Sequence, residues 1–172
     1  MNAEVSHPMQ ISQPTREYLE GLKAVDFELA YLALLTREGL KPMSRWEKPL
    51  GDYELLLLGR TGLVIRQVPR TVKTGKQVIE TVFGISSPWI QVYEQRFAGQ
   101  PIDKSPETVR LEGFLFGYPP CCVERYAHHP YAPNDLPDED RKIIFHWPCK
   151  DCRITPLLMP AYGQVCGAVE SC

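Results

Sequence analysis

The sequence predicts an α+β protein in which an N-terminal helix lies on a small antiparallel meander and a mostly helical, cysteine-containing half follows. Three observations support this class. Apolar residues recur at helical spacing near the N-terminus, three short strand-like segments follow, and the second half is rich in proline and cysteine. A length of 172 residues suits a single domain over 1–172, with a helix and meander at 14–100 and a helical cysteine-cluster half at 101–172.

The first predicted element is a helix from residue 15 to about 38, which follows a flexible tail at residues 1–13. Apolar side chains on one face of this helix are three and four residues apart; they are Tyr18, Leu22, Val25, Leu29 and Leu32. Thr15 is the expected N-cap and Gly39 the expected terminator. A broad apolar face normally packs into a core, so we assign no chemistry to this helix.

The meander is predicted from three segments that follow a loop at residues 40–52. Tyr53–Leu58, Leu63–Val68 and Gln77–Gly84 have the composition of strands. Residues 59–62 contain two glycines and are short enough to join the first two segments as a hairpin. The N-terminal helix is then available to cover one face of the sheet.

The second half is predicted to consist of short helices. Residues 88–98 form the first, and a second follows the N-cap Ser105, with proline and glutamate in its first turn, and ends at Gly117. A third begins after the double proline at 119–120, because proline is tolerated in the first turn of a helix. An acidic loop leads into a fourth helix at 137–145.

The composition indicates a soluble protein of the cytoplasm. The net charge of −2 gives no general electrostatic attraction to nucleic acid or to an anionic membrane. The N-terminus lacks the features of a secretory signal, and the longest aliphatic run, Leu55–Leu58, is too short to cross a bilayer. Six cysteines in a reducing compartment favour metal binding or thiol chemistry over structural disulfides.

The first cysteine pair, Cys121-Cys122, lies at the predicted start of a helix. Free amides and the helix dipole favour negative charge there, so both cysteines are expected to be biased toward thiolate. A buried pair of small apolar residues, or a strained vicinal disulfide, is the alternative. Because consecutive side chains on a helix point about 100° apart, the two cysteines are not expected to contribute equally to one site.

The second pair, Cys149-x-x-Cys152, has the spacing at which a tight turn brings two sulfurs onto one ion. Together with the upstream pair, it predicts a tetrahedral site of four cysteines, or of three cysteines and a histidine. The candidate ligands are Cys121, Cys122, Cys149, Cys152 and His146. Zinc is the favoured ion, and an iron–sulfur cluster is the alternative because four cysteine ligands suit it equally.

The remaining histidines and cysteines are not expected to join this site. His128 and His129 would lie roughly 10 Å along the helix from the first cysteine pair, too far to share one metal, and are expected at the surface or at the helix end. Cys166 has small and apolar neighbours and is expected in the core, whereas Cys172 is expected to be exposed.

Two other classes of function remain open. In a thiol enzyme or redox protein, Cys121 or Cys122 would be the nucleophile, His146 its base, and Cys149 and Cys152 a resolving pair. In a metal-stabilised binding module, the basic hairpin at 60–76 would engage nucleic acid. The second idea has less support, because that segment has no aromatic platform between its basic residues.

The two cysteine elements also resemble a known family. Gly-Tyr-Pro-Pro-Cys-Cys at 117–122 and His-Trp-Pro-Cys-Lys-Asp-Cys at 146–152 are similar to the Gly-Tyr-Pro-x-Cys-Cys and His-x-Pro-Cys-x-x-Cys elements of an uncharacterised, mainly archaeal domain-of-unknown-function family. The resemblance covers roughly residues 106–155. It implies that these cysteines act together, and it implies no particular activity.

Overall fold

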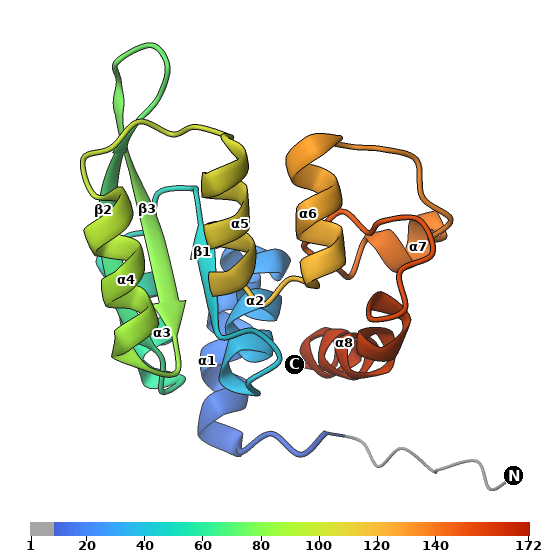
Figure 1. Cartoon of the computed structure of the whole chain (residues 1–172). Helices are drawn as coiled ribbons and strands as arrows, with labels where there is room; N and C mark the ends of the chain where they lie inside the picture. Colours follow the sequence, from blue (N-terminus) through green and yellow to red (C-terminus); the bar gives the residue numbers. More distant parts are fainter. Residues whose placement is uncertain (1–8) are drawn as a thin grey trace, which may run out of the picture.

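The computed structural model describes residues 9–172, in which helices surround one antiparallel sheet (Figure 1). The helices are α1 (Gln13–Val25), α2 (Phe27–Arg37), α3 (Asp52–Arg60), α4 (Ser87–Phe97), α5 (Pro106–Leu115), α6 (Pro120–His128), α7 (Asp138–Arg141) and α8 (Thr155–Glu170). The strands are β1 (Met43–Trp46), β2 (Val64–Thr71) and β3 (Gln77–Gly84). The predicted α+β class, with a mostly helical C-terminal half, is confirmed.

The predicted N-terminal helix is in fact two helices, because the backbone is extended at Asp26. The Asp26 carboxylate accepts a hydrogen bond from the amide of Glu28 at 2.9 Å and pairs with Lys48 at 2.6 Å. The prediction of one helix over 15–38 is therefore wrong at this residue, where an aspartate caps the second helix instead of continuing the first. Gly39 follows the end of α2 as expected, with a φ of 74°.

The start of α1 also differs from the prediction. Ser12, and not Thr15, is the N-cap of α1. Met9 and Ile11, within the predicted tail, pack against the core, and the rest of that tail, residues 1–8, lies outside the described residues.

The sheet has the order β1-β3-β2, and both neighbouring pairs are antiparallel. Two of the predicted strands, 63–68 and 77–84, correspond to β2 and β3, which pair along their full length from Val64 opposite Gly84. The third strand comes from the predicted loop at 40–52. The sheet is therefore one hairpin with β1 added on the far side of β3, and not a meander of consecutive strands.

The predicted strand Tyr53–Leu58 is wrong, because this segment forms α3. The Glu54 carboxylate accepts a hydrogen bond from the Gly51 amide at 2.8 Å, which stabilises the helix start. Leu57 and Leu58 are buried. A Cβ added to Gly21 in α1 would lie 2.7 Å from Leu57 Cδ1, so the two helices pack closely. Leucine is unbranched at Cβ and favours a helix wherever such packing is available.

The helices of the second half largely follow the prediction. Those predicted at 88–98 and after Ser105 correspond to α4 and α5, and the Ser105 hydroxyl accepts a hydrogen bond from the amide of Thr108 at 3.3 Å. The helix predicted at 137–145 is shorter and covers only Asp138–Arg141.

The core has two parts, and the sheet contributes to both. One part joins α1, α2, α3 and α8 through buried side chains such as Leu19, Leu34 and Val165. The other lies between the sheet and α4, with Val82 and Tyr93 at its centre. The C-terminal helix α8 is thus anchored to the N-terminal helices, and the cysteine segments lie between α8 and α5.

Two glycines set the position of α6. A Cβ added to Gly113 in α5 would lie 2.4 Å from Val123 Cγ2 in α6, so only glycine allows the two helices to approach this closely. Gly117, in the connection between them, has a φ of 70°, and a Cβ there would lie 2.6 Å from Pro42 Cδ. These contacts fix the helix start that carries Cys121 and Cys122.

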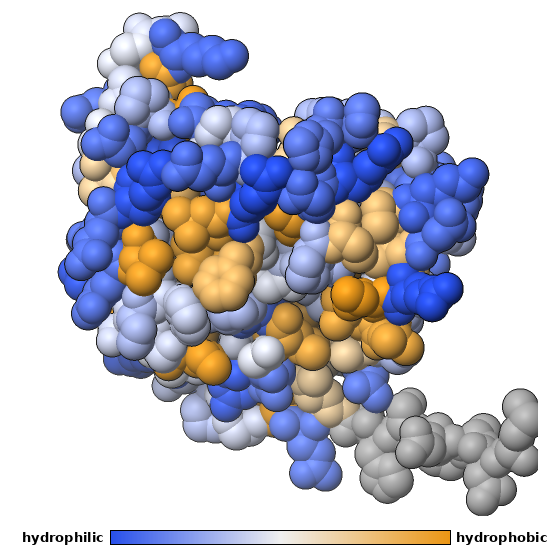
Figure 2. All heavy atoms as spheres, in the orientation of Figure 1, coloured by the Kyte–Doolittle hydropathy of each residue, from blue (hydrophilic) through white to orange (hydrophobic). Residues whose placement is uncertain are grey.

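Exposed apolar side chains gather over α4 and α5 and, separately, near α8 (Figure 2). Trp89 and Phe114 form an edge-to-face pair with ring centroids 5.4 Å apart, and Ile154 and Leu157 lie near the start of α8. Exposed apolar residues are usual on folded proteins, and we assign no function to these.

Candidate metal centre

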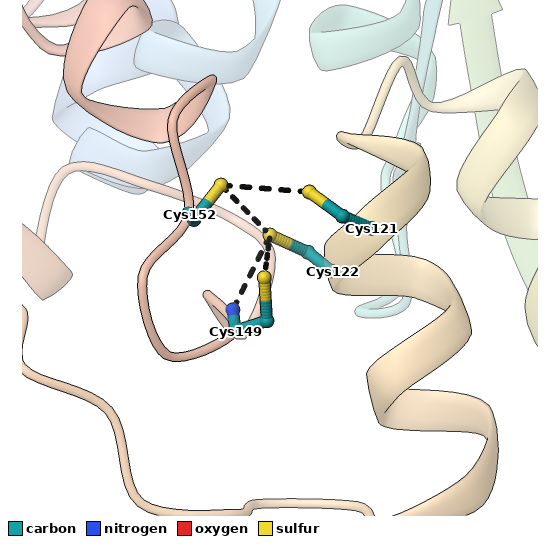
Figure 3. Close-up of side chains that lie close together, drawn as sticks. All are labelled: Cys121, Cys122, Cys149 and Cys152. Atoms are coloured by element: carbon teal, nitrogen blue, oxygen red, sulfur yellow. Dashed lines mark hydrogen bonds between the residues drawn. The ribbon is translucent and has the colours of Figure 1, made fainter.

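Four cysteine sulfurs lie together where the start of α6 meets the loop between α7 and α8 (Figure 3). All four Sγ atoms lie within 4.8 Å of one another. The Sγ–Sγ separations are 3.7 Å for Cys121 and Cys152, 3.8 Å for Cys122 and Cys149, and 3.4 Å for Cys122 and Cys152. All four are free thiols, so the vicinal disulfide considered for Cys121-Cys122 does not form in this structure.

Three of the six sulfur–sulfur separations are close to those of a tetrahedral site. A tetrahedron with metal–sulfur bonds of about 2.3 Å has sulfur–sulfur edges of about 3.8 Å. The measured values of 3.4, 3.7 and 3.8 Å lie close to that edge. The four cysteines could therefore hold a metal ion, and both Cys121 and Cys122 lie in the group, although Cys121 is exposed and Cys122 is buried.

Local backbone structure explains how each pair reaches the site. Cys121 and Cys122 occupy the first turn of α6, where the Cys122 amide donates to the Pro119 carbonyl at 2.9 Å. The segment from Cys149 to Cys152 is a tight turn, closed by a hydrogen bond of 3.3 Å from the Cys152 amide to the Cys149 carbonyl. The backbone at Asp151 is left-handed, with a φ of 59°, a conformation that aspartate tolerates better than most residues.

Backbone amides also donate hydrogen bonds to two of the sulfurs. The Cys149 amide donates to Cys122 Sγ and the Thr155 amide to Cys152 Sγ, each at 3.3 Å. The Thr155 hydroxyl lies a further 3.2 Å from Cys152 Sγ. Donors of this kind orient metal-binding groups and stabilise their charged form.

The thiols differ in acidity. Burial raises the pKa of Cys122, and burial with a hydrogen bond to Cys121 raises the pKa of Cys149 to about 11. Burial also acts on Cys152, but hydrogen bonds from the Thr155 hydroxyl and amide outweigh it and lower the pKa of Cys152 to about 6. The expectation that the helix start favours thiolate is thus not met for Cys122, because desolvation dominates there and raises its pKa.

His146 lies beside the four sulfurs and does not belong to the group. Its Nε2 atom lies 2.8 Å from the Thr155 hydroxyl, so in residues 9–172 its hydrogen bond goes to that hydroxyl and not to a sulfur. Burial, with a smaller effect of Lys41, lowers the pKa of His146 to about 4. A neutral imidazole therefore supports the site through Thr155.

The other predicted positions fall outside the site. His128 is exposed and pairs with Glu124 at 2.8 Å, and α6 ends at these histidines, as expected. Cys166 is partly buried and packs against the core. Cys172 was expected to be exposed, but it is partly buried and packs against the core.

The three arginines of segment 60–76 do not form one surface. Arg60 ends α3 and its guanidinium lies 5.9 Å from the ring centroid of Tyr18. Arg66 pairs with Glu94 at 3.3 Å. Arg70 is 1% exposed and pairs with Glu80 at 3.2 Å, so its charge is compensated in the interior.

Thr155 is the residue of the site that the sequence analysis missed. It is buried and lies within hydrogen-bonding distance of His146 and Cys152. A local signal was present, since Thr155-Pro156 opens α8 three residues after Cys152 and has the composition of a helix start.

Comparison of the chain with protein-family models, with curated proteins and with solved structures finds no match. The resemblance to the uncharacterised archaeal family therefore stays a prediction. None of the helices in the described residues is long and apolar enough to span a membrane. Fold and site together define an α+β protein with a four-cysteine group that could hold a metal ion.

Proposed function

We propose that this protein binds one Zn²⁺ ion through Cys121, Cys122, Cys149 and Cys152, and that the ion has a structural role. The observation that carries the proposal is the gathering of the four sulfurs within 4.8 Å, with three separations close to the edge of a zinc tetrathiolate. Zinc is the commonest ion in closed sites of four thiolates. Such a site requires reduced thiols, which supports a cytoplasmic location.

The same spacing favours a single ion over an iron–sulfur cluster. In a cluster of four irons each cysteine binds a different iron, so the cysteine sulfurs lie around the cluster and farther from one another. Here all four sulfurs lie within 4.8 Å, which leaves space for one ion at their centre.

A structural role follows from the closed ligand set. With four thiolates bound, no position remains open for water or substrate, in contrast to catalytic zinc sites. The ion would join the start of α6 to the turn before α8, two segments far apart in the sequence (Figure 3). The free energy of metal binding then adds to the free energy of folding.

Metal analysis with a visible absorption spectrum tests the proposal on protein purified without oxygen. We expect one equivalent of zinc per chain and no colour. The variant Cys149→Ser should lose most of the metal, whereas Cys166→Ser, a matched control in α8, should keep it. A brown protein with iron and sulfide would contradict the assignment to zinc, and wild-type protein without metal would contradict the proposed function.

A thiol redox function is the second candidate, and the 3.4 Å separation of Cys122 Sγ and Cys152 Sγ favours it. The two thiols would reduce a disulfide of a partner molecule to two thiols and would themselves form a disulfide, with two electrons and two protons transferred. Anaerobic protein without metal that reduces a small disulfide reagent with the loss of these two thiols would support this candidate. Stoichiometric zinc with unreactive thiols would dismiss it.

We do not extend the proposal to nucleic acid. Arg66 and Arg70 already pair with carboxylates, and Arg70 is buried.

A further inference from the structure

A cavity of about 530 Å³ lies beside the candidate metal centre. Its walls come from α5, α6 and the segment 141–147, with Arg45 of β1 on another side. The volume falls in the range of small-molecule sites, roughly 300–1,000 Å³. The proposed zinc ion is closed to substrates, so this cavity would serve a separate purpose.

Aromatic rings are a prominent part of the cavity wall. Six of them line it, namely Phe116, Tyr118, Tyr126, Tyr131, Phe145 and Trp147. The ring of Tyr131 makes edge-to-face contacts with Tyr126 and Trp147, with centroid distances of 5.2 and 5.4 Å. Rings arranged in this way offer faces and edges on which a planar molecule can stack.

The backbone holds two of these rings in place. The indole Nε1 of Trp147 donates a hydrogen bond to the Ala132 carbonyl at 2.6 Å, which fixes the plane of its ring. Tyr131 has a left-handed backbone with a φ of 58°, which is uncommon for a residue with a bulky side chain. Tyr131 is 62% exposed, so its ring lies at the rim of the cavity. The left-handed backbone that places this ring there is unfavourable in free energy.

The charges at the cavity argue against an anionic ligand. Three cations and three carboxylates line it. Arg45 already pairs with Glu47 at 2.8 Å and with Glu112 at 2.5 Å, and Arg141 pairs with Asp138. These groups present both donors and acceptors with little excess charge, a pattern that suits a neutral molecule with polar edges.

We infer that the cavity binds an uncharged planar heteroaromatic molecule of the nucleobase or nucleoside class. The ring system would stack on the aromatic wall formed by Tyr126, Tyr131 and Trp147. Its polar edge would exchange hydrogen bonds with the Arg45 and Glu112 side chains, which are about one-fifth exposed. The cavity also touches Cys122 and His146, so the proposed zinc ion would stabilise one of its walls.

Ligand-observed NMR and isothermal titration calorimetry test this inference with four probes, adenosine, guanosine, cytidine and uridine, on the protein as purified. We expect at least one probe to bind saturably and to change the fluorescence of Trp147, and the Trp147→Phe variant to lose that change. Tyr126→Ala should weaken binding about tenfold or more, since a stacking platform is lost. Tyr53→Ala, which removes an exposed tyrosine ring on α3 that does not line this cavity, should leave binding unchanged.

Three results would overturn the inference. One is the failure of all four nucleosides to bind at millimolar concentration. Another is binding that Tyr126→Ala and Tyr53→Ala affect equally, which would place the ligand elsewhere. The third is a 5′-monophosphate that binds much more tightly than its nucleoside, because the cavity would then select charge. The zinc content and circular dichroism of each variant show whether it has folded, and they do not depend on the ligand.

Discussion

At the scale of single residues, Thr155 connects an imidazole to the cysteine group. Its hydroxyl lies 2.8 Å from His146 Nε2 and 3.2 Å from Cys152 Sγ. When Cys152 is a thiolate, the hydroxyl donates its proton to the sulfur and accepts from the imidazole, which fixes the Nε2–H tautomer of His146. The result is a chain of hydrogen bonds that runs from the imidazole to a proposed zinc ligand.

Removal of this hydroxyl should weaken zinc binding without removing a ligand. We expect Thr155→Val to lower zinc affinity about 10- to 100-fold, because partners that orient metal ligands typically contribute that much. Competition with a colorimetric chelator measures the change. Thr155→Ser keeps the hydroxyl and should stay within a few-fold of the wild type. Equal affinities for Thr155→Val and the wild type would show that the hydrogen bond is not needed.

Lys41 is a buried base in an aromatic environment. Its side chain is 1% exposed, and its ammonium donates to the Phe116 carbonyl at 2.9 Å and lies 4.5 Å from the ring centroid of Tyr118. Burial lowers the pKa of Lys41 to about 7. The unfolded chain, with an ordinary lysine pKa, therefore binds more protons than the folded protein between pH 7 and about 10.

This difference makes stability rise with pH. Because the unfolded state holds the extra proton, the free energy of unfolding should increase by about 2 kcal/mol from neutral pH to about pH 10. This increase is smaller than the full pKa shift implies, because the aromatic rings around Lys41 favour its charged form. In Lys41→Met this increase should disappear. Urea denaturation of both proteins at several pH values measures it. Parallel curves would show that Lys41 titrates normally.

At the scale of secondary-structure elements, the contact between α5 and α6 decides where the first cysteine pair lies. Gly113 and Val123 meet at this contact, and a Cβ on Gly113 would lie 2.4 Å from Val123 Cγ2. The position of the start of α6 therefore depends on the contact between Gly113 and Val123.

A methyl group at Gly113 should push the helices apart. We expect Gly113→Ala to lower the free energy of unfolding by about 1–3 kcal/mol, which is typical of overpacking, and to weaken zinc binding because Cys121 and Cys122 shift with α6. Thermal denaturation and chelator competition measure the two effects. Val123→Ala in the same chain should restore much of the loss. Gly163→Ala is the control, since a Cβ there would have no packing neighbour within 4 Å among residues 9–172. Equal effects of the two glycine variants would contradict this account.

At the scale of the whole molecule, the cysteine half is held in two ways. Hydrophobic packing joins α8 to α1 and α2. The proposed metal centre joins α6 to the turn before α8. The segment between these helices, 129–154, contains only one short helix of four residues and should depend most on the metal.

Metal removal should therefore loosen one part of the molecule before the rest. After chelation under reducing conditions, we expect faster hydrogen exchange in α6 and residues 142–154, and little change in β2 and β3, which lie in the other half (Figure 1). Hydrogen-exchange mass spectrometry measures this, and added zinc should reverse it. Uniform acceleration would mean that the ion stabilises the whole fold, and no acceleration would mean that it has no structural role.

The sequence predicted the elements whose signals are local. Ser105 capped α5, Gly39 followed the end of α2, and the strand-like composition of 77–84 predicted β3, because each feature follows from a residue and its near neighbours. It failed at Tyr53–Leu58, where a leucine run is compatible with strand or helix. Packing of Leu57 against Gly21 is available only to the helix, and a single segment does not reveal its partner.

For the site, the sequence by itself indicated the four cysteines, together with His146, as candidate ligands, since the C-x-x-C turn and the helix start after two prolines are local structures. Only the tertiary structure decided that Cys121 and Cys122 both face the second pair, and that Thr155 stands between His146 and the sulfurs. It alone showed the aromatic cavity beside them. The physical reason is that the relative positions of these residues depend on close packing between helices, such as that of Gly113 in α5 against Val123 in α6. Each helix forms from its own local sequence, which does not specify the helix it packs against.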